Sequence, residues 1–125
     1  MDNLIAWLLN FAWDHGIGYV LTRELSPATP SCVSPVENTI IINMNWRNQK
    51  ELPFQIAHEI AHCLNHDVGI CYYTTSMKIK TERAANLKAI QILQHYCVLN
   101  DIDYCNYVSF AERFGVPLNV IESLS

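Results

Sequence analysis

Runs of positive charge are missing from this sequence. Its eight Lys and Arg residues are scattered along the chain and are outnumbered by twelve Asp and Glu, which gives a formal net charge of -4. Nucleic-acid binding depends on a concentrated basic surface. We therefore expect no direct nucleic-acid ligand, because a protein partner or a peptide substrate suits this charge balance better.

A disulfide framework is also missing. The five cysteines are odd in number and contain no CxxC pair, whereas a secreted domain held by disulfides usually has an even count. Reduced thiols in a cytosol are the simpler interpretation.

The sequence has no apolar run long enough for a membrane span. Its first nine residues carry no positive charge, and Asn10 and Asp14 interrupt the apolar stretch that they begin. A membrane-spanning helix needs about 20 apolar residues, and a signal peptide begins with positive charge. We expect a cytoplasmic protein with no membrane association, which begins with an amphipathic helix.

Repeats, linkers and low-complexity segments are absent as well. Half of the residues are hydrophobic and 16% are charged, which is the balance of a compact globular protein. A chain of 125 residues can bury a core without disulfides or a structural metal. We expect one domain over residues 1–125.

Hydrophobic spacing predicts a small sheet after the first helix. Apolar residues between positions 4 and 12 repeat at helical intervals, and His15 and Gly16 mark the helix exit. Segments 17–25 and 39–44 are rich in β-branched or aromatic residues, and prolines and serines lie between them. This pattern predicts an antiparallel sheet of two or three strands.

The remainder of the chain is predicted to be helical. Asn48 and Glu51 fit a capping box, and Pro53 either kinks the following helix or marks its first turn. A second long helix is expected over residues 81–97, and two short helices separated at residues 115–117 follow it. This order of elements indicates an α+β fold.

The first of these long helices contains the motif HExxH, as His58-Glu59-Ile60-Ala61-His62. Histidines at positions i and i+4 lie on one helical face, so both rings can reach one ion. The Glu59 carboxylate projects beside them, where it can take a proton from a water that attacks a carbonyl carbon. We predict one zinc ion per chain, with His58 and His62 as ligands and Glu59 as the general base. The alternative is a pair of core histidines whose ring nitrogens have hydrogen-bond partners, beside a surface glutamate.

A hydrolytic zinc ion usually has three protein ligands, and the sequence offers two candidates for the third. His66 would extend the same helix, where histidines at i, i+4 and i+8 span about 12 Å, too far for one ion. Glu82 opens the next helix, 20 residues after His62, and that helix can fold back against the first. We therefore favour Glu82, with Asn86 one turn later to support a ligand histidine by a hydrogen bond. The alternative is that Glu82 is no ligand and only interacts favourably with the positive, N-terminal end of its helix.

Two segments give the chain a resemblance to a known family. Residues 54–62 read Phe-Gln-Ile-Ala-His-Glu-Ile-Ala-His, residues 82–86 read Glu-Arg-Ala-Ala-Asn, and a strand-like Ile-Ile-Ile-Asn precedes both at 40–43. HExxH alone occurs in many zinc peptidases. Together with Phe54, Ala57 and the downstream E-x-x-A-N, it resembles the ImmA/IrrE-type metallopeptidases of bacterial genomes, prophages and integrative elements.

The resemblance implies a zincin-like fold and a cytoplasmic zinc endopeptidase. By this resemblance His58, His62 and Glu82 would be a gluzincin-like ligand set, and Glu59 would be the base. It also implies a protein substrate, a helix-turn-helix transcriptional repressor of a phage or mobile element. The family's second helix often continues F-A-x-x-L-L-M-P, whereas residues 87–94 here read Leu-Lys-Ala-Ile-Gln-Ile-Leu-Gln, a difference in the wall of the substrate groove.

A donor that stabilises the oxyanion would complete such a site. Tyr72, Tyr73 and His95 are candidates, although a structural role suits each of them as well. Segment 108–117 resembles half of a helix-turn-helix but contains one basic residue, so we interpret it as packing or partner contact and not as a DNA reader.

A second, structural zinc site could combine Cys63, His66 and Cys71, but their spacing is not of the C-x2-C type. Cys63 is better explained as a small residue near the buried face of the zinc helix.

Two other functions are compatible with the sequence. One is a catalytically silent zinc-binding module for protein interaction, and the other is a toxin or antitoxin component of a mobile element. A protein that only binds zinc needs the ligands but no general base, so an intact Glu59 favours the enzyme. A neighbouring repressor gene would count against the toxin or antitoxin.

Overall fold

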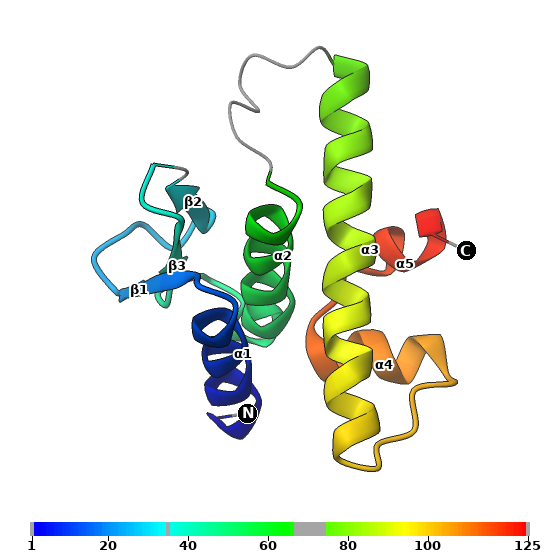
Figure 1. Cartoon of the computed structure of the whole chain (residues 1–125). Coiled ribbons are helices and arrows are strands. Elements are labelled where there is room, and N and C mark those ends of the chain that lie inside the picture. Colours follow the sequence, from blue (N-terminus) through cyan, green and yellow to red (C-terminus); the bar gives the residue numbers. More distant parts are fainter. Residues whose placement is uncertain (1, 35, 67–74, 125) are drawn as a thin grey trace.

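The computed structural model describes residues 2–34, 36–66 and 75–124, which form the α+β fold that the sequence predicts. Figure 1 shows the elements in chain order. They are α1 (Asp2–Asp14), β1 (Gly18–Thr22), β2 (Cys32–Ser34), β3 (Thr39–Asn43), the 3-10 helix η1 (Gln49–Glu51), α2 (Leu52–Leu64), α3 (Thr75–Leu99), α4 (Tyr107–Phe114) and α5 (Leu118–Leu124). None of the helices in these ranges is long and apolar enough to cross a membrane.

The sheet has three strands in the order β1-β3-β2 and is mixed. β2, which lies in the segment between the two predicted strands, pairs antiparallel with β3, with Cys32 opposite Ile41. β1 pairs parallel with β3, with Gly18 opposite Thr39, so the expectation of a purely antiparallel sheet is wrong. The chain reverses between β1 and β2 and again between β2 and β3, so β1 and β3 run the same way, and β1 takes the free edge of β3.

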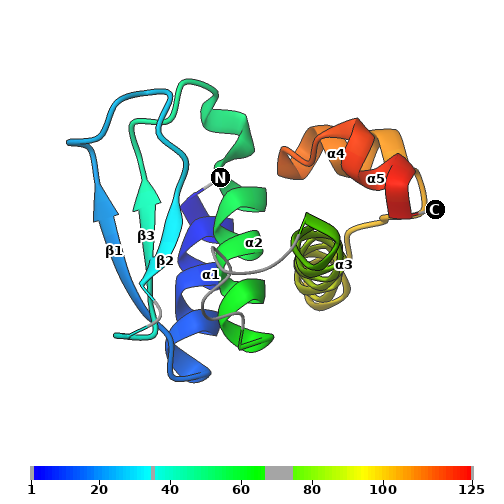
Figure 2. The same ribbon diagram turned by 90° about the horizontal axis from the view of Figure 1, so that it is seen from above.

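The helices lie in layers on one side of the sheet. Seen from above, α1 and α2 cover one face of the sheet, α3 lies beyond α2, and α4 and α5 lie to one side of α3, where α4 also contacts α2 and η1 (Figure 2). α2 is therefore the central helix of the molecule, with the sheet on one side and α3 on the other.

The apolar core fills the space between these layers. Ile40 and Ile42 of β3, Leu8 of α1, and Ile56 and Ile60 of α2 have no exposed surface. Ile56 and Ile60 are four residues apart, as expected for neighbours on one helical face. This packing fixes the rotation of α2 about its own axis, and so decides where the residues of its other faces point.

α3 approaches α2 through small side chains. Ala85 and Ala89 are completely buried, and Glu82 lies on the same helical face, three and seven residues earlier. The figures agree that α3 runs beside α2, and it starts near the end at which α2 finishes (Figures 1 and 2). The antiparallel return predicted for the second long helix is thus present, although α3 begins at Thr75 and not near residue 81.

The start of α2 differs in one detail from the prediction. Asn48 does cap a helix, since its side chain accepts a hydrogen bond from the Lys50 N–H at the start of η1. The Glu51 carboxylate does not reach back to Asn48, because it accepts a hydrogen bond from the Trp46 indole N–H at 2.8 Å. Pro53 lies in the first turn of α2, where its missing N–H costs nothing.

The two short C-terminal helices, α4 and α5, are present as predicted. Asn106 caps α4 by accepting hydrogen bonds from the Val108 and Ser109 N–H groups. Gly115 ends α4 with φ of 71°, a left-handed conformation that glycine adopts without strain.

Candidate metal centre

Three side chains from two helices converge between α2 and α3. His58 and His62 lie one turn apart on α2, and Glu82 comes from the first half of α3. The Nε2 atom of His58 is 3.0 Å from Oε2 of Glu82 and 3.0 Å from Nε2 of His62. The Nε2 atom of His62 is 3.2 Å from Oε1 of Glu82. Residues distant in sequence therefore present their donor atoms to one point.

The spacing of these atoms fits a metal ion. Ligand atoms about 2.0–2.1 Å from a tetrahedral zinc are about 3.3 Å from one another, close to the 3.0–3.2 Å found between the Nε2 and carboxylate atoms. Two imidazole nitrogens and one carboxylate are a donor set that suits zinc and several other divalent ions. His58, His62 and Glu82 could hold a metal ion.

Protons alone satisfy this arrangement poorly. If both rings carried a proton on Nε2 for Glu82, the two N–H groups would face each other across 3.0 Å. If one ring lacked that proton, its nitrogen and the carboxylate would be acceptors in contact. A shared cation removes this conflict. The His58 Nδ1 atom, in turn, is buried without a hydrogen-bond partner in the part of the chain that the structure describes.

Glu82 is held in the form that binds metal. Hydrogen bonds with His58 and His62 keep the pKa of its carboxyl well below the usual range, so the group is an anion at neutral pH. The side chains of His58 and His62 are 16% and 10% exposed, whereas that of Glu82 is 47% exposed. The centre is thus closed on the α2 side and accessible beside Glu82.

Glu59 is a carboxyl whose proton affinity is shifted toward neutrality. Burial raises its pKa to about 7 from the ordinary 4.5; nearby His58 and His62 oppose this rise, and the Glu82 charge adds to it. A general base works best when its pKa lies near the working pH. In the metal-free protein, Glu59 therefore has the proton affinity that such a role needs.

The Glu59 charge also acts on two thiols that flank it. Burial raises the pKa of the Cys63 thiol to about 11, with a smaller contribution from Glu59, and the same two causes raise the pKa of Cys32. Cys32 lies on the edge strand β2, which contacts α2. We did not identify Cys32 from the sequence, because a lone cysteine after a proline-rich turn carries no motif. Cys63 itself is buried, as predicted.

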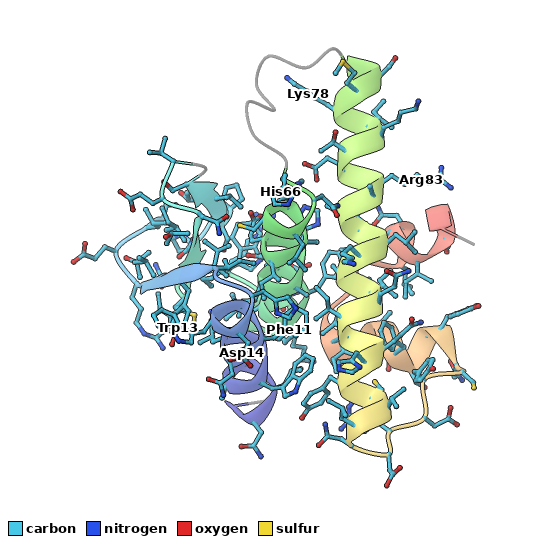
Figure 3. All side chains as sticks on the ribbon, viewed as in Figure 1. Phe11, Trp13, Asp14, His66, Lys78 and Arg83 are labelled. Carbon is cyan, nitrogen blue, oxygen red and sulfur yellow. The ribbon has the colours of Figure 1, made fainter. Side chains whose placement is uncertain are left out.

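The structure places the two other histidines considered from the sequence outside the three-residue centre, with His66 at a helix end. α2 ends at Leu64, and His66 has φ of 56°, so His66 does not extend the helix; Figure 3 places it at the end of α2. His95 cannot donate to an oxyanion here, because it lies 13 residues after Glu82 on the same helix, about 20 Å along its axis. Its ring contacts Trp7 of α1 at a centroid distance of 5.8 Å.

The remaining candidates are not placed at the centre by a contact. Asn86 is partly buried one turn after Glu82, but the hydrogen bonds found within the described ranges do not join it to His58 or His62. Its supporting role stays a prediction. Tyr72 and Tyr73, the candidate oxyanion donors, lie outside the described residues, as does Cys71 of the alternative zinc site.

Comparison with known proteins agrees with the resemblance read from the sequence. The sequence model of a peptidase family described as the IrrE N-terminal-like domain matches residues 15–123. No curated protein and no solved structure matches the chain significantly.

Proposed function

Because the chain belongs to the peptidase family of the IrrE N-terminal-like domain, we propose that it is a zinc-dependent endopeptidase that hydrolyses a peptide bond in a protein substrate. The observation that carries this proposal is the convergence of His58, His62 and Glu82 within 3.0–3.2 Å of one another beside a carboxyl, Glu59, whose pKa is about 7.

Each residue has a separate part in the proposed reaction. His58, His62 and Glu82 would bind the ion and leave its fourth position for water and substrate. When bound, zinc polarises the scissile carbonyl and makes a water acidic enough to lose its proton near neutral pH. Glu59 accepts that proton as the water oxygen bonds to the carbonyl carbon. Glu59 then transfers the proton to the leaving amide nitrogen as the C–N bond breaks.

The proposal extends to the substrate and the setting. From the ImmA/IrrE resemblance of segments 54–62 and 82–86, we infer a helix-turn-helix transcriptional repressor of a phage or mobile element as the substrate, in the cytoplasm. A protein substrate is also consistent with the net charge of -4, which does not favour direct nucleic-acid binding.

The competing function is a zinc-binding interaction module without turnover. It requires the three ligands but gives no reason for a carboxyl next to them with a pKa near 7. Glu59 therefore supports the enzyme, and its removal discriminates between the two functions.

The test compares Glu59→Gln with wild type after both are loaded with zinc. We expect Glu59→Gln to bind zinc normally and to lose at least about 100-fold in hydrolysis of a quenched fluorescent peptide library, because general-base catalysis contributes about 100- to 10,000-fold. Glu112→Gln, an exposed glutamate of α4, is the matched control and should keep full activity. Equal hydrolysis by wild type and Glu59→Gln would refute the mechanism.

A further inference from the structure

A shallow groove begins beside the candidate metal centre and runs along α3. It has a volume of about 340 Å³, and its lining includes Asn65, Thr81, Ala84, Leu87 and Gln91. Asn65 follows His62 by three residues, and Thr81 directly precedes Glu82. One end of the groove therefore adjoins the proposed site of hydrolysis.

The groove combines apolar and basic side chains. Ala84 and the half-exposed Leu87 contribute apolar surface, and Lys80 and Lys88 complete the lining, in which no acidic residue takes part. Lysine side chains can lay their methylene stems along such a surface and keep the ammonium groups in water. Neither lysine forms an ion pair within the described ranges, so both charges are available to a partner.

The first half of α3 carries more positive than negative charge. Although the sequence has no run of consecutive positive charges, four of the eight Lys and Arg lie between positions 78 and 88, against one acidic residue, Glu82. Figure 3 shows Lys78 and Arg83 pointing to opposite sides of α3. In a chain with a net charge of -4, this first half of α3 is a local reversal of charge.

The distance between Lys80 and Lys88 indicates what kind of ligand the groove would bind. Lys80 and Lys88 are eight residues apart, about 12 Å along the helix axis. Carboxylates at positions i and i+8 of a helix laid along α3 have the same separation, and an apolar side chain between them would rest on Ala84 and Leu87. Amphipathic helices commonly bind grooves in this way.

We propose that this groove is the docking site for an acidic amphipathic helix of the protein substrate, which holds the substrate next to the metal centre. This inference rests on the proposed peptidase function, which makes the bound helix part of a substrate. The binding itself does not depend on catalysis. A docking contact outside the scissile segment would add affinity to the contacts made at the centre.

The test measures binding by fluorescence anisotropy, with the full chain carrying Glu59→Gln so that nothing is cleaved. The probe is a labelled 16-residue helical peptide with leucines on one face and glutamates eight residues apart at its edges. We expect Lys80→Glu with Lys88→Glu to weaken binding at least about tenfold, since two attractive charge pairs become repulsive. Arg23→Glu with Lys50→Glu changes the net charge equally at exposed positions outside α3 and should change binding less than about twofold.

Other outcomes overturn the proposal. Equal weakening by both double variants would show a general charge effect, and equal binding of a peptide with lysines in place of glutamates would remove the charge complementarity. Tighter binding of duplex DNA at Lys80 and Lys88 would assign the groove to nucleic acid. If the wild-type chain binds the peptide but cannot bind zinc, the proposed peptidase function is refuted and the docking site is not. If the enzyme is active but does not bind the peptide, only the proposed docking site is refuted.

Discussion

In the metal-free protein, burial of the ionised Glu59 carboxylate lowers the stability of the fold. Its pKa is about 7 in the folded chain, above the ordinary 4.5, because the carboxyl is buried. At pH values between 4.5 and about 7, the Glu59 carboxyl is ionised in the unfolded chain but still protonated in the folded chain. The free energy of unfolding of the metal-free protein should therefore fall as the pH rises through this range.

Replacing Glu59 by glutamine removes this pH dependence. In a chelator, we expect Glu59→Gln to be more stable than wild type by up to about 3 kcal/mol near pH 8 and equal to it near pH 4, because one pKa unit corresponds to about 1.4 kcal/mol. Urea denaturation at the two pH values measures the difference. A variant that is less stable than wild type near pH 8 would show that the Glu59 carboxylate stabilises the fold and bears no such cost.

Asn43 is the completely buried polar residue that holds the segment leading into β2. Its side-chain N–H groups donate to the carbonyl oxygens of Ser26 and Thr29 at 2.8 and 2.6 Å, and its Oδ1 accepts from the Asn45 N–H at 2.9 Å. β2 follows this segment and lies beside Glu59. The network therefore ties β3 to the segment that leads into β2.

We predict that Asn43→Ala lowers the free energy of unfolding by about 2–3 kcal/mol, because it removes three hydrogen bonds made by a completely buried side chain. Asn45→Ala is the control: it removes one exposed hydrogen bond, to the Leu25 carbonyl, and should cost less than about 1 kcal/mol. Urea denaturation reports both. Similar costs for the two variants would mean that the Asn43 network is not structurally important.

At the scale of elements, the contact between α4 and η1 depends on one glycine. Gly115 has φ of 71°, and a Cβ atom there would overlap the Lys50 carbonyl oxygen and lie 2.6 Å from the Glu51 Cα. Gly16 has a similar φ of 75°, but a Cβ atom would meet nothing within 4 Å. Substitution of Gly16 therefore tests backbone strain alone, whereas substitution of Gly115 tests backbone strain and steric overlap together.

We expect Gly16→Ala to lower the free energy of unfolding by about 1 kcal/mol, the cost of the left-handed conformation for alanine. Gly115→Ala should cost at least about 3 kcal/mol, because backbone must also move away from η1. Thermal or urea unfolding of the pair gives the comparison. Equal losses would show that α4 is free to shift away from η1.

Local patterns predicted individual elements well and their pairing less well. The apolar spacing of the chain was sufficient for α1, α2 and the short helices around Gly115. It could not specify that β1 pairs parallel with β3, because strand order depends on which edge of β3 the returning chain reaches. The Glu51 carboxylate likewise binds the Trp46 indole, a partner that a capping pattern does not include.

At the scale of the molecule, the candidate site was predictable where its residues share a motif. HExxH places His58 and His62 by helical periodicity alone, and Glu82 follows from a second helix folding back. His95 could have been excluded from the sequence, because its separation from Glu82 along the predicted helix already amounts to about 20 Å. The groove between Lys80 and Lys88 was missed because it depends on which face of α3 the packing of Ala85 and Ala89 leaves exposed.

The central claim is that His58, His62 and Glu82 bind one ion, and the metal content of the purified protein tests it most directly. Elemental analysis should find about one zinc per chain in wild type and in Glu112→Gln. His62→Ala should lose the zinc, and so should Glu82→Gln, a change at a half-exposed carboxyl that preserves its shape and should leave the fold intact. A wild-type chain that holds no metal after zinc is added back, or a Glu82→Gln chain that keeps all of it, would contradict the account.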